Sequence, residues 1–327
     1  MFAPTIISRN SSINKFRYNK ETKESPLGKY PKRILINIGS RSEYCKTKAR
    51  QIEKEGGVVL NHPSVIPNAS DKVRTKELFN LYKVPTPNYA LATDSDLVDS
   101  LNLPLVAKLK KGSGGEGMLL LETKDDIEAF YKDYAEKLSL YFIEEVFQPI
   151  FSKNYEFRVI CFPDAIGSPL EVCDTLLLQE NGISLAVEDQ INVNYLYHVP
   201  TTAYIVRKKI KKDAIDSGEF GRNISSGNGY FTSDIELPKL EDKHGYGFNT
   251  WLQTKLGEIS LAAITALSLD FGAVDIIFDS DTMTFSVLEV NTAFSLEGER
   301  SSDAFQKTIM EYMSSLFYEF LYKENKK

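Results

Sequence analysis

The sequence predicts an α/β (α+β) protein built from a small βαβ-type domain and two further α+β units. Short apolar runs alternate with helical periodicity over residues 33–95. Further along, strand-like runs flank a glycine-rich segment at 111–117, and a long helical pattern precedes an apolar hairpin near the C-terminus. A chain of 327 residues, 42% hydrophobic and 26% charged, can bury a large core without disulfides or a structural metal.

Composition excludes several classes of protein. The formal net charge of -6 disfavours a dedicated nucleic-acid binder. No apolar run approaches the roughly 18 residues of a membrane span, and the N-terminus lacks the pattern of a secretory signal. Three widely spaced cysteines without a CxxC motif, beside three histidines, support neither a disulfide framework nor a zinc site. We therefore expect a cytoplasmic protein without membrane partners; a homo-oligomer is compatible with the sequence.

Four segments are expected in chain order. Residues 1–32 are polar and are interpreted as a flexible arm, disordered until a partner binds. An N-terminal α/β domain (33–95), a unit with a glycine-rich loop (96–149) and a C-terminal unit (150–327) follow. The expected strands are 33–39, 58–60, 103–108, 118–121, 140–147, 156–162, 170–178, 203–210 and the two arms of a hairpin over 271–290, and the expected helices are 42–56, 72–79, 125–137, 251–268 and 302–322.

The glycine-rich segment contains a GxGxxG spacing, formed by Gly112, Gly114 and Gly117. A dinucleotide fingerprint with this spacing needs a helix directly after the glycines, whereas a strand-like run follows here at 118–121. The pattern therefore predicts a hairpin, which is either a plain turn or a loop whose backbone N–H groups bind phosphates. Lys108, on the incoming strand, is placed to direct its ammonium toward such phosphates.

The strongest functional signal is the pair of runs FGAVDIIF and SVLEVN near the C-terminus. Folding this hairpin about position 282 sets Asp275 opposite Glu289, and alternation along the strand puts Asn291 on the same face. Two carboxylates and an amide form an oxygen-only site that suits Mg²⁺ bridging substrate phosphates. The alternative is a solvated outer face, which is disfavoured because an unpaired carboxylate inside apolar strands is costly.

Other charged groups suggest contacts with a nucleotide. An acidic pair at 144–145 leads out of a buried strand, and Arg158, within an apolar strand, needs an anion such as phosphate. The alternative for Arg158 is a surface ion pair with Glu156. Arg222 lies in a glycine-flanked loop and is either a phosphoryl contact or part of a mobile surface loop. The basic run 207–212 is interpreted as a solvated face, with a docking strip for acidic substrates as the alternative.

Six segments stand in a recognisable order: NHPSVIPNASDKVRTKELF, PLVAKLKKGSGGEGM, IEEVF, YEFRVI, FGRN and LDFGAVDIIF…VLEVN…LEG. Their order resembles the ATP-grasp superfamily, and within it the branch of ribosomal-protein-S6 glutamate ligase and glutathione synthetase. The resemblance implies the ATP-grasp fold, with the nucleotide held between a small subdomain (96–149) and a C-terminal subdomain (150–327). It also marks residues near 163–203 as an insertion relative to the bacterial ligases.

The resemblance implies cofactors and site residues as well. ATP and Mg²⁺ are the expected cofactors, with two ions and with Mn²⁺ as an alternative metal. Mg²⁺ would be held by Asp275, Glu289 and Asn291, and the catalytic arginines would be Arg158 and Arg222. The residues expected to bind ATP are Lys72, Lys108, Gly112, Ser113, Gly114, Gly115, Gly117, Glu144, Glu145, Val146, Phe147, Glu156 and Asn223.

The implied activity is ATP-dependent carboxylate–amine ligation through an acyl phosphate, with ATP cleaved to ADP and phosphate. Its partners would be a carboxylate and an amine substrate: an amino acid, or a peptide or protein tail. Two alternatives remain, a non-catalytic ATP-binding regulatory or scaffold module on the same fold, and a Rossmann oxidoreductase, which needs a helix after Gly117. The chain departs from the family where Thr292 and Ala293 follow Asn291 in place of the usual proline or serine-proline.

Overall fold

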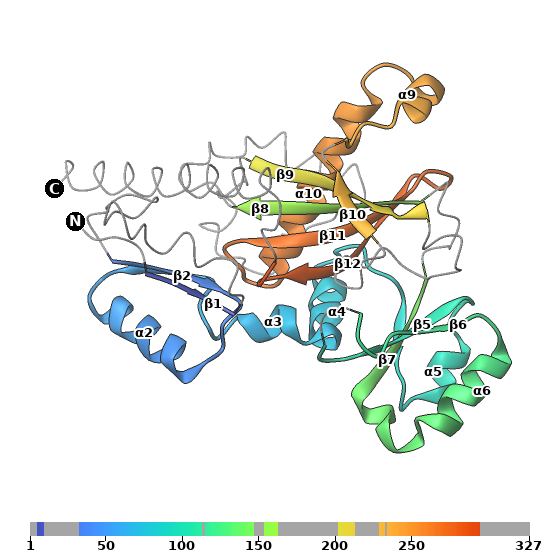
Figure 1. Ribbon diagram of the computed structural model, residues 1–327, viewed down its shortest axis with the longest axis horizontal. Helices are drawn as coiled ribbons and strands as arrows, with labels where there is room; N and C mark the ends of the chain where they lie inside the picture. The colour runs from blue at the N-terminus through green and yellow to red at the C-terminus, as the bar shows by residue number, and fades with distance from the viewer. Residues whose placement is uncertain are drawn as a thin grey trace.

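The computed structural model describes residues 5–9, 33–112, 115–146, 154–162, 202–212, 229–232 and 234–294. Within these ranges the chain forms three sheets, each associated with its own helices (Figure 1). None of the helices in the described ranges is long and apolar enough to cross a bilayer. The expected strand at 170–178 and the expected helix at 302–322 lie outside the described residues.

The N-terminal sheet is parallel and has the order β1-β2-β3. Its strands are β1 (Thr5–Ser8), β2 (Ile34–Ile38) and β3 (Val58–Leu60), and α2 (Glu43–Lys54) packs against them. The Ser42 side chain caps α2 by accepting a hydrogen bond from the Cys45 N–H. The sequence predicts a flexible arm over residues 1–32, with ordered structure beginning at Arg33. This prediction is wrong for Thr5–Ser8, which form β1. That strand pairs with β2 across more than twenty intervening residues, and local periodicity does not report such a long-range pairing.

The second sheet is antiparallel and has the order β4-β7-β5-β6. Its strands are β4 (Tyr89–Leu91), β5 (Leu105–Leu109), β6 (Leu119–Leu121) and β7 (Tyr141–Glu145). Its helices are α5 (Ser95–Asp99), α6 (Lys124–Asp133) and the 3-10 helix η2 (Ala135–Leu140). A capping box between Thr123 and Asp126 begins α6. Sequence reasoning missed β4 and α5, which are too short for a clear period.

The third sheet is antiparallel and has the order β10-β9-β8-β11-β12. Its strands are β8 (Asn154–Phe162), β9 (Thr202–Ile210), β10 (Gly229–Thr232), β11 (Gly272–Asp279) and β12 (Thr284–Asn291). The helices α9 (Pro238–His244) and α10 (Phe248–Ala266) follow β10 in the chain. Residues 162 and 202 are direct partners, so the segment between β8 and β9 leaves and re-enters the sheet at adjacent positions.

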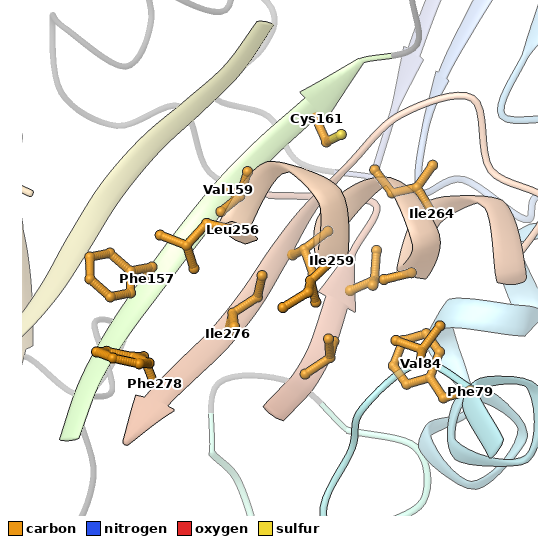
Figure 2. Close-up of a cluster of buried hydrophobic side chains, with 14 of the residues drawn as sticks. Phe79, Val84, Phe157, Val159, Cys161, Leu256, Ile259, Ile264, Ile276 and Phe278 are labelled. Atoms are coloured by element: carbon orange, nitrogen blue, oxygen red, sulfur yellow. The ribbon is translucent and has the colours of Figure 1, made fainter. Parts of the chain in front are cut away.

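One face of this third sheet forms the main core. Phe157, Val159, Ile276 and Phe278 alternate along β8 and β11 and pack against apolar side chains of α10 such as Ile259 (Figure 2). Because successive strand residues point to opposite faces, the polar residues between them lie on the other face of the sheet. Because α10 covers the apolar face of the third sheet, the opposite, polar face is the one available for a functional site.

Two short helices connect the N-terminal sheet to the rest of the molecule. These are α3 (Ile66–Ser70) and α4 (Lys72–Leu81), and Phe79 of α4 joins the core of the third sheet (Figure 2). Beyond α4, the N–H of Val287 on β12 donates to the Pro85 carbonyl at 2.7 Å. These contacts place α4 between the second and third sheets (Figure 1).

Candidate active site

The polar face of the third sheet collects charged side chains from four neighbouring strands. Register makes Glu156 the partner of Lys208, and Asp275 the partner of both Arg158 and Glu289. The predicted opposition of Asp275 and Glu289 is confirmed. It depends on a β-bulge, because Asp275 pairs with Glu289 whereas the next residue of β11 pairs with Val287, which leaves Leu288 as the extra residue.

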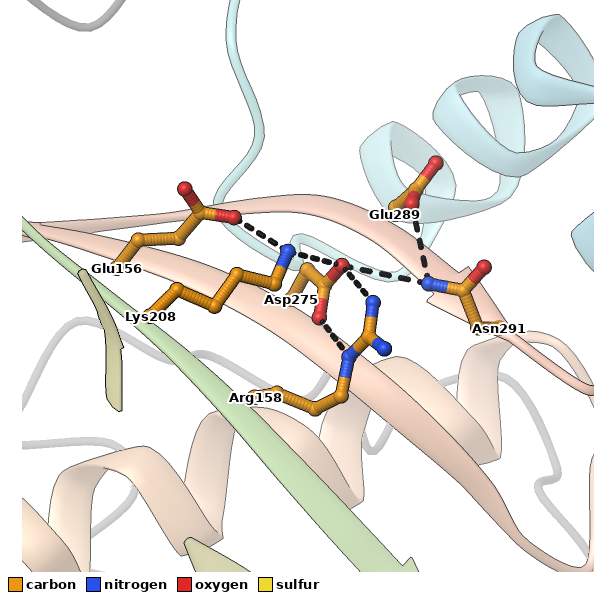
Figure 3. Close-up of polar contacts among 6 residues, drawn as sticks. All are labelled: Glu156, Arg158, Lys208, Asp275, Glu289 and Asn291. Carbon is orange, nitrogen blue, oxygen red and sulfur yellow. Dashed lines mark hydrogen bonds and ion pairs between the residues drawn. The ribbon is translucent and has the colours of Figure 1, made fainter. Parts of the chain in front are cut away.

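Asp275 is the centre of this charged cluster (Figure 3). The Arg158 guanidinium donates to both of its oxygens, Nε to Oδ1 and Nη2 to Oδ2, each at 2.7 Å. Lys208 Nζ donates to Asp275 Oδ2 at 2.7 Å and to Glu156 Oε1 at 2.5 Å. Only 1% of the Asp275 side chain is exposed. The alternative of a surface pair between Arg158 and Glu156 is therefore wrong: Arg158 is bound bidentately to Asp275, a geometry that only a guanidinium supplies.

The interpretation of the basic run 207–212 as a solvated face is wrong for Lys208, which is buried. Alternation along β9 sends Lys208 to the charged face and its two neighbours to the other. Lys209 pairs with Asp234 at 3.0 Å, and the Arg207 guanidinium lies over the Tyr155 ring at 4.8 Å from its centroid. Sequence reasoning missed Lys208 as a site residue. The signal that was present is the strand period itself, which separates Lys208 from Arg207 and Lys209.

Burial disfavours the charged form of each group, but mutual attraction outweighs it. The pKa of Asp275 is lowered to about 2 because Arg158 and Lys208 stabilise its carboxylate more than burial destabilises it. In the same way the pKa of Arg158 is raised, despite burial, by Asp275. The pKa of Lys208 is raised, again against burial, by Asp275 and Glu156. Asp275, Arg158 and Lys208 are therefore all charged in the physiological pH range.

Glu289 and Asn291 complete the cluster at the edge formed by β12. The Asn291 amide Nδ2 donates to Glu289 Oε1 at 3.0 Å and lies 3.3 Å from Asp275 Oδ2 (Figure 3). Within the described part of the chain no group of three or more His, Cys, Asp and Glu side chains could hold a metal. The set here is two carboxylates and an amide, which matches the oxygen ligands that Mg²⁺ takes while keeping waters and phosphates. Glu289 is the carboxylate of this set that no lysine or arginine contacts within the described residues.

A second cluster lies on the second sheet, around Glu144 of β7. The ammonium of Lys108, on β5, bonds Glu144 Oε1, and Lys76 Nζ, from α4, lies 2.7 Å from Oε2. Glu144 is 1% exposed. Its pKa is lowered because the two lysines outweigh the effect of burial. The Glu289 carboxylate favours the charged forms of Lys72 and Lys108, so the two clusters act on each other electrostatically.

Glu145 points away from this cluster, in contrast to the expectation for the acidic pair. Its carboxylate accepts hydrogen bonds from the Asn102 N–H at 2.9 Å and from the Asn88 amide at 2.8 Å. The N–H groups of Glu145 and Val146 donate to the Asn88 and Pro104 carbonyls at 3.0 Å each. Strand alternation causes the difference, because neighbouring residues of β7 cannot face the same side. The side chain of Glu145 thus connects β7 to the segments that contain Asn88 and Asn102.

The glycine-rich segment joins β5 to β6 as an antiparallel hairpin, with Ala107 opposite Leu119. The strand that follows Gly117 removes the helix that a Rossmann fingerprint requires, so that alternative is wrong. Gly117 has φ 66°, and a Cβ there would lie 2.9 Å from Leu109 Cδ1. Gly115 also has positive φ. Lys72 Nζ donates to the Gly112 carbonyl at 2.7 Å, which attaches the base of the loop to α4.

Five of the residues expected at the site lie outside the described residues: Ser113, Gly114, Phe147, Arg222 and Asn223. Of the others, Glu156, Arg158, Asp275, Glu289 and Asn291 lie in the first cluster, and Lys108 and Glu144 lie in the second. Lys76 is a second residue that sequence reasoning missed. Its side chain is 1% exposed, and nothing in the local pattern of α4 distinguishes it from the solvated lysines of the chain.

Acid should destabilise the protein through the buried carboxylates. Because the pKa of Asp275 in the folded state lies near 2, below the value of about 3.9 for an unfolded chain, its contribution is present above pH ~4 and is lost as the pH falls toward 2. That contribution is about 2–3 kcal/mol. We expect urea denaturation between pH 6 and pH 3 to show a weaker pH dependence in Asp275→Asn. Asp242→Asn, which removes an exposed carboxylate of α9, should keep the wild-type profile; equal profiles for Asp275→Asn and wild type would contradict the assignment.

Parts of this chain are similar in sequence to known proteins. The chain matches no established protein-family model. It is 27% identical over 188 residues to carbamoyl-phosphate synthase of Methanobrevibacter smithii, covering 54% of this chain and 48% of that protein. It is 28% identical over 144 residues to ribosomal protein bS6–L-glutamate ligase of Escherichia fergusonii, covering 42% and 47%. The chain thus spans about half the length of these curated relatives.

Solved structures of D-alanine–D-alanine ligase from Bacillus anthracis share the fold. One superposes with a TM-score of 0.55 at 16% identity, covering 97% of each chain. The same enzyme complexed with ATP gives a TM-score of 0.54 at 17% identity, covering 97% of this chain and 98% of that chain. These ligases and the two sequence relatives are all ATP-grasp enzymes. The chain therefore has the ATP-grasp fold and resembles ATP-grasp enzymes in sequence.

Proposed function

We propose that this protein is an ATP-dependent carboxylate–amine ligase, which forms an amide bond through an acyl phosphate and releases ADP and phosphate. The observation that carries the proposal is a pair of charged clusters that influence each other electrostatically: Lys108–Glu144–Lys76, and Lys208–Arg158–Asp275 with Glu289. Phosphoryl transfer needs this kind of site, because catalysis there consists of positioning and charge stabilisation without a protein nucleophile. The relatives named above, a glutamate ligase among them, support the assignment.

Each cluster would have its own part in binding ATP and Mg²⁺. Lys108 would exchange its bond to Glu144 for the nucleotide phosphates, and the hairpin at 111–117 would cover them with backbone N–H groups. Glu289, Asn291 and Asp275 would hold the metal, with room for two ions or for Mn²⁺ in place of Mg²⁺. When bound, the metal would neutralise charge on the phosphate oxygens.

Arg158 and Lys208 would stabilise the phosphoryl group as it passes to the substrate carboxylate. Both cations are held by Asp275, so they are oriented before the substrate arrives and cost little reorganisation during transfer. The acyl phosphate then has to be shielded from water until the amine attacks. The glycine hairpin would act as this cover, since it connects β5, which carries Lys108, to β6.

We propose amino acids or peptides as substrates, because the similar glutamate ligases and D-alanine–D-alanine ligase act on such molecules by name. We also propose three domains near the limits 33–95, 96–149 and 150–327. Two strands depart from these limits, because β1 (Thr5–Ser8) pairs in the first sheet and β4 (Tyr89–Leu91) pairs in the second. A cytoplasmic location is supported by Cys45 and Cys161, which are buried free thiols.

A non-catalytic ATP-binding module is the second candidate. The observation in its favour is the complete pairing of Asp275, whose two oxygens accept hydrogen bonds from Arg158, Lys208 and Asn291. A protein of this kind would bind the nucleotide but would not turn it over. Release of ADP on addition of amino acids or peptides discriminates between the two candidates.

Thermal unfolding with nucleotides tests the proposal directly. ADP or ATP at 100 times its dissociation constant should stabilise the protein by about 2.7 kcal/mol, a rise of several degrees in Tm. We expect the rise to need Mg²⁺, to be absent with NAD and to be lost in Lys108→Met. Lys132→Met is the matched control, because Lys132 is an exposed lysine of α6 outside the proposed phosphate site. No rise with either nucleotide in the wild-type protein would overturn the ATP proposal.

A further inference from the structure

Lys76 is a buried lysine with two partners on different parts of the molecule. It is 1% exposed, and its Nζ lies 2.7 Å from Glu144 Oε2 and donates to Thr86 Oγ1 at 2.7 Å. Burial lowers the pKa of this lysine although Glu144 opposes the shift. An ammonium without access to water is costly, and an apolar side chain of similar volume would fill the same space at lower cost. The positions of Glu144 and Thr86 indicate a role for the ammonium of Lys76.

The Thr86 hydroxyl extends the contact to β12. It accepts from Lys76 and donates to the Val287 carbonyl at 3.0 Å. The Val287 N–H donates in turn to the Pro85 carbonyl at 2.7 Å. Val287 immediately precedes the bulge residue Leu288, after which Glu289 faces Asp275. An ion pair followed by two hydrogen bonds therefore connects Glu144 on the second sheet to the strand that carries Glu289.

Lys108 and Lys76 share the carboxylate of Glu144. If Lys108 turns to the nucleotide phosphates, as in the function proposed above, Lys76 is the cation that keeps Glu144 paired and in place. We propose that Lys76 and Thr86 are positioning residues that hold the phosphate-binding cluster of the second sheet in register with Glu289 on β12. Binding of the nucleotide and binding of the metal are then coupled through these two side chains. This inference rests on the proposed function.

The experiment measures ADP affinity by isothermal titration calorimetry with and without Mg²⁺. Thr86→Val removes the hydroxyl and keeps the shape of the side chain. We expect ADP affinity without Mg²⁺ to stay close to that of the wild type, and the gain in affinity on adding Mg²⁺ to fall about tenfold, the size of one hydrogen bond to a charged group. Thr86→Ser, which retains the hydroxyl, should restore the gain.

Two further variants separate positioning from a general loss of stability. Thr75→Val is the matched control, because Thr75 is also buried on α4 and its hydroxyl donates to the Asn68 carbonyl at 2.7 Å without contacting Lys76 in any described bond. It should keep the full Mg²⁺ gain. In the Lys76→Met background, Thr86→Val should cause no further loss, because the hydroxyl acts through the ammonium.

The outcomes distinguish this inference from the function on which it rests. Wild-type protein without Mg²⁺-dependent ADP binding overturns both. Wild-type protein with that dependence, together with a full gain in Thr86→Val, overturns the positioning role alone. An equal loss in Thr75→Val also overturns it, because the effect would then follow from weakening α4.

Discussion

Asp275→Asn should lower the free energy of unfolding by about 3–5 kcal/mol, the cost of breaking a buried ion pair from one side. The variant keeps the shape of the side chain but leaves the Arg158 guanidinium and the Lys208 ammonium without their shared carboxylate. Glu156 still bonds Lys208, so Arg158 bears most of the loss. Urea denaturation followed by circular dichroism at pH 7 measures the change, and the slope with urea should stay the same.

Asp234→Asn serves as the comparison, since it removes a carboxylate that pairs with Lys209 at 3.0 Å while 62% exposed. We expect it to cost less than about 1 kcal/mol. If both variants lose the same small amount, the charged cluster is hydrated in solution, and its proposed preorganisation for phosphoryl transfer loses its basis. If Asp275→Asn alone loses a large part of the free energy of unfolding, the result supports a cluster that excludes water and holds its side chains in fixed positions.

Glu289→Gln should abolish nucleotide turnover, with a loss of at least about 100-fold. It removes the carboxylate of the proposed metal site that accepts a hydrogen bond from Asn291 and contacts no lysine or arginine within the described residues. The fold should survive, since Glu289 is only partly buried and glutamine can still accept the Asn291 hydrogen bond. ADP release in the presence of the substrate measures turnover. Calorimetry of ADP with and without Mg²⁺ measures the metal independently of activity.

The exposed Glu236 provides the control substitution, as Glu236→Gln changes the net charge equally at a distance from the clusters. It should leave both readouts unchanged. Near-normal turnover in Glu289→Gln would remove this residue from the metal site. Loss of turnover with unchanged Mg²⁺ dependence of ADP binding would instead assign Glu289 to the substrate.

Much of the site could be predicted because the residues lie in strands with a clear period. Asp275 and Glu289 are separated by one turn-rich loop, so symmetry of the hairpin brings them together. The agreement depended on the bulge, however. The turn pairs Asp279 with Thr284, and without the extra residue the same register would place Leu288 opposite Asp275. The glycine hairpin was predictable for a related reason, since strand-like residues stand on both sides of it.

The amino-acid order of this chain thus determines most of its longer elements and the hairpin that pairs Asp275 with Glu289, because these depend on neighbours close in sequence. The order of its motifs carries the resemblance to ATP-grasp enzymes. The burial of Lys76 and Lys208 depends on contacts formed in the folded molecule. Lys208 is neutralised by Glu156 and Asp275, which lie 52 and 67 residues away, and Lys76 by Glu144 on another sheet. A lysine can be buried only where distant strands supply a carboxylate. The strand period separates Lys208 from Arg207 and Lys209, but no local pattern shows which carboxylates neutralise either lysine.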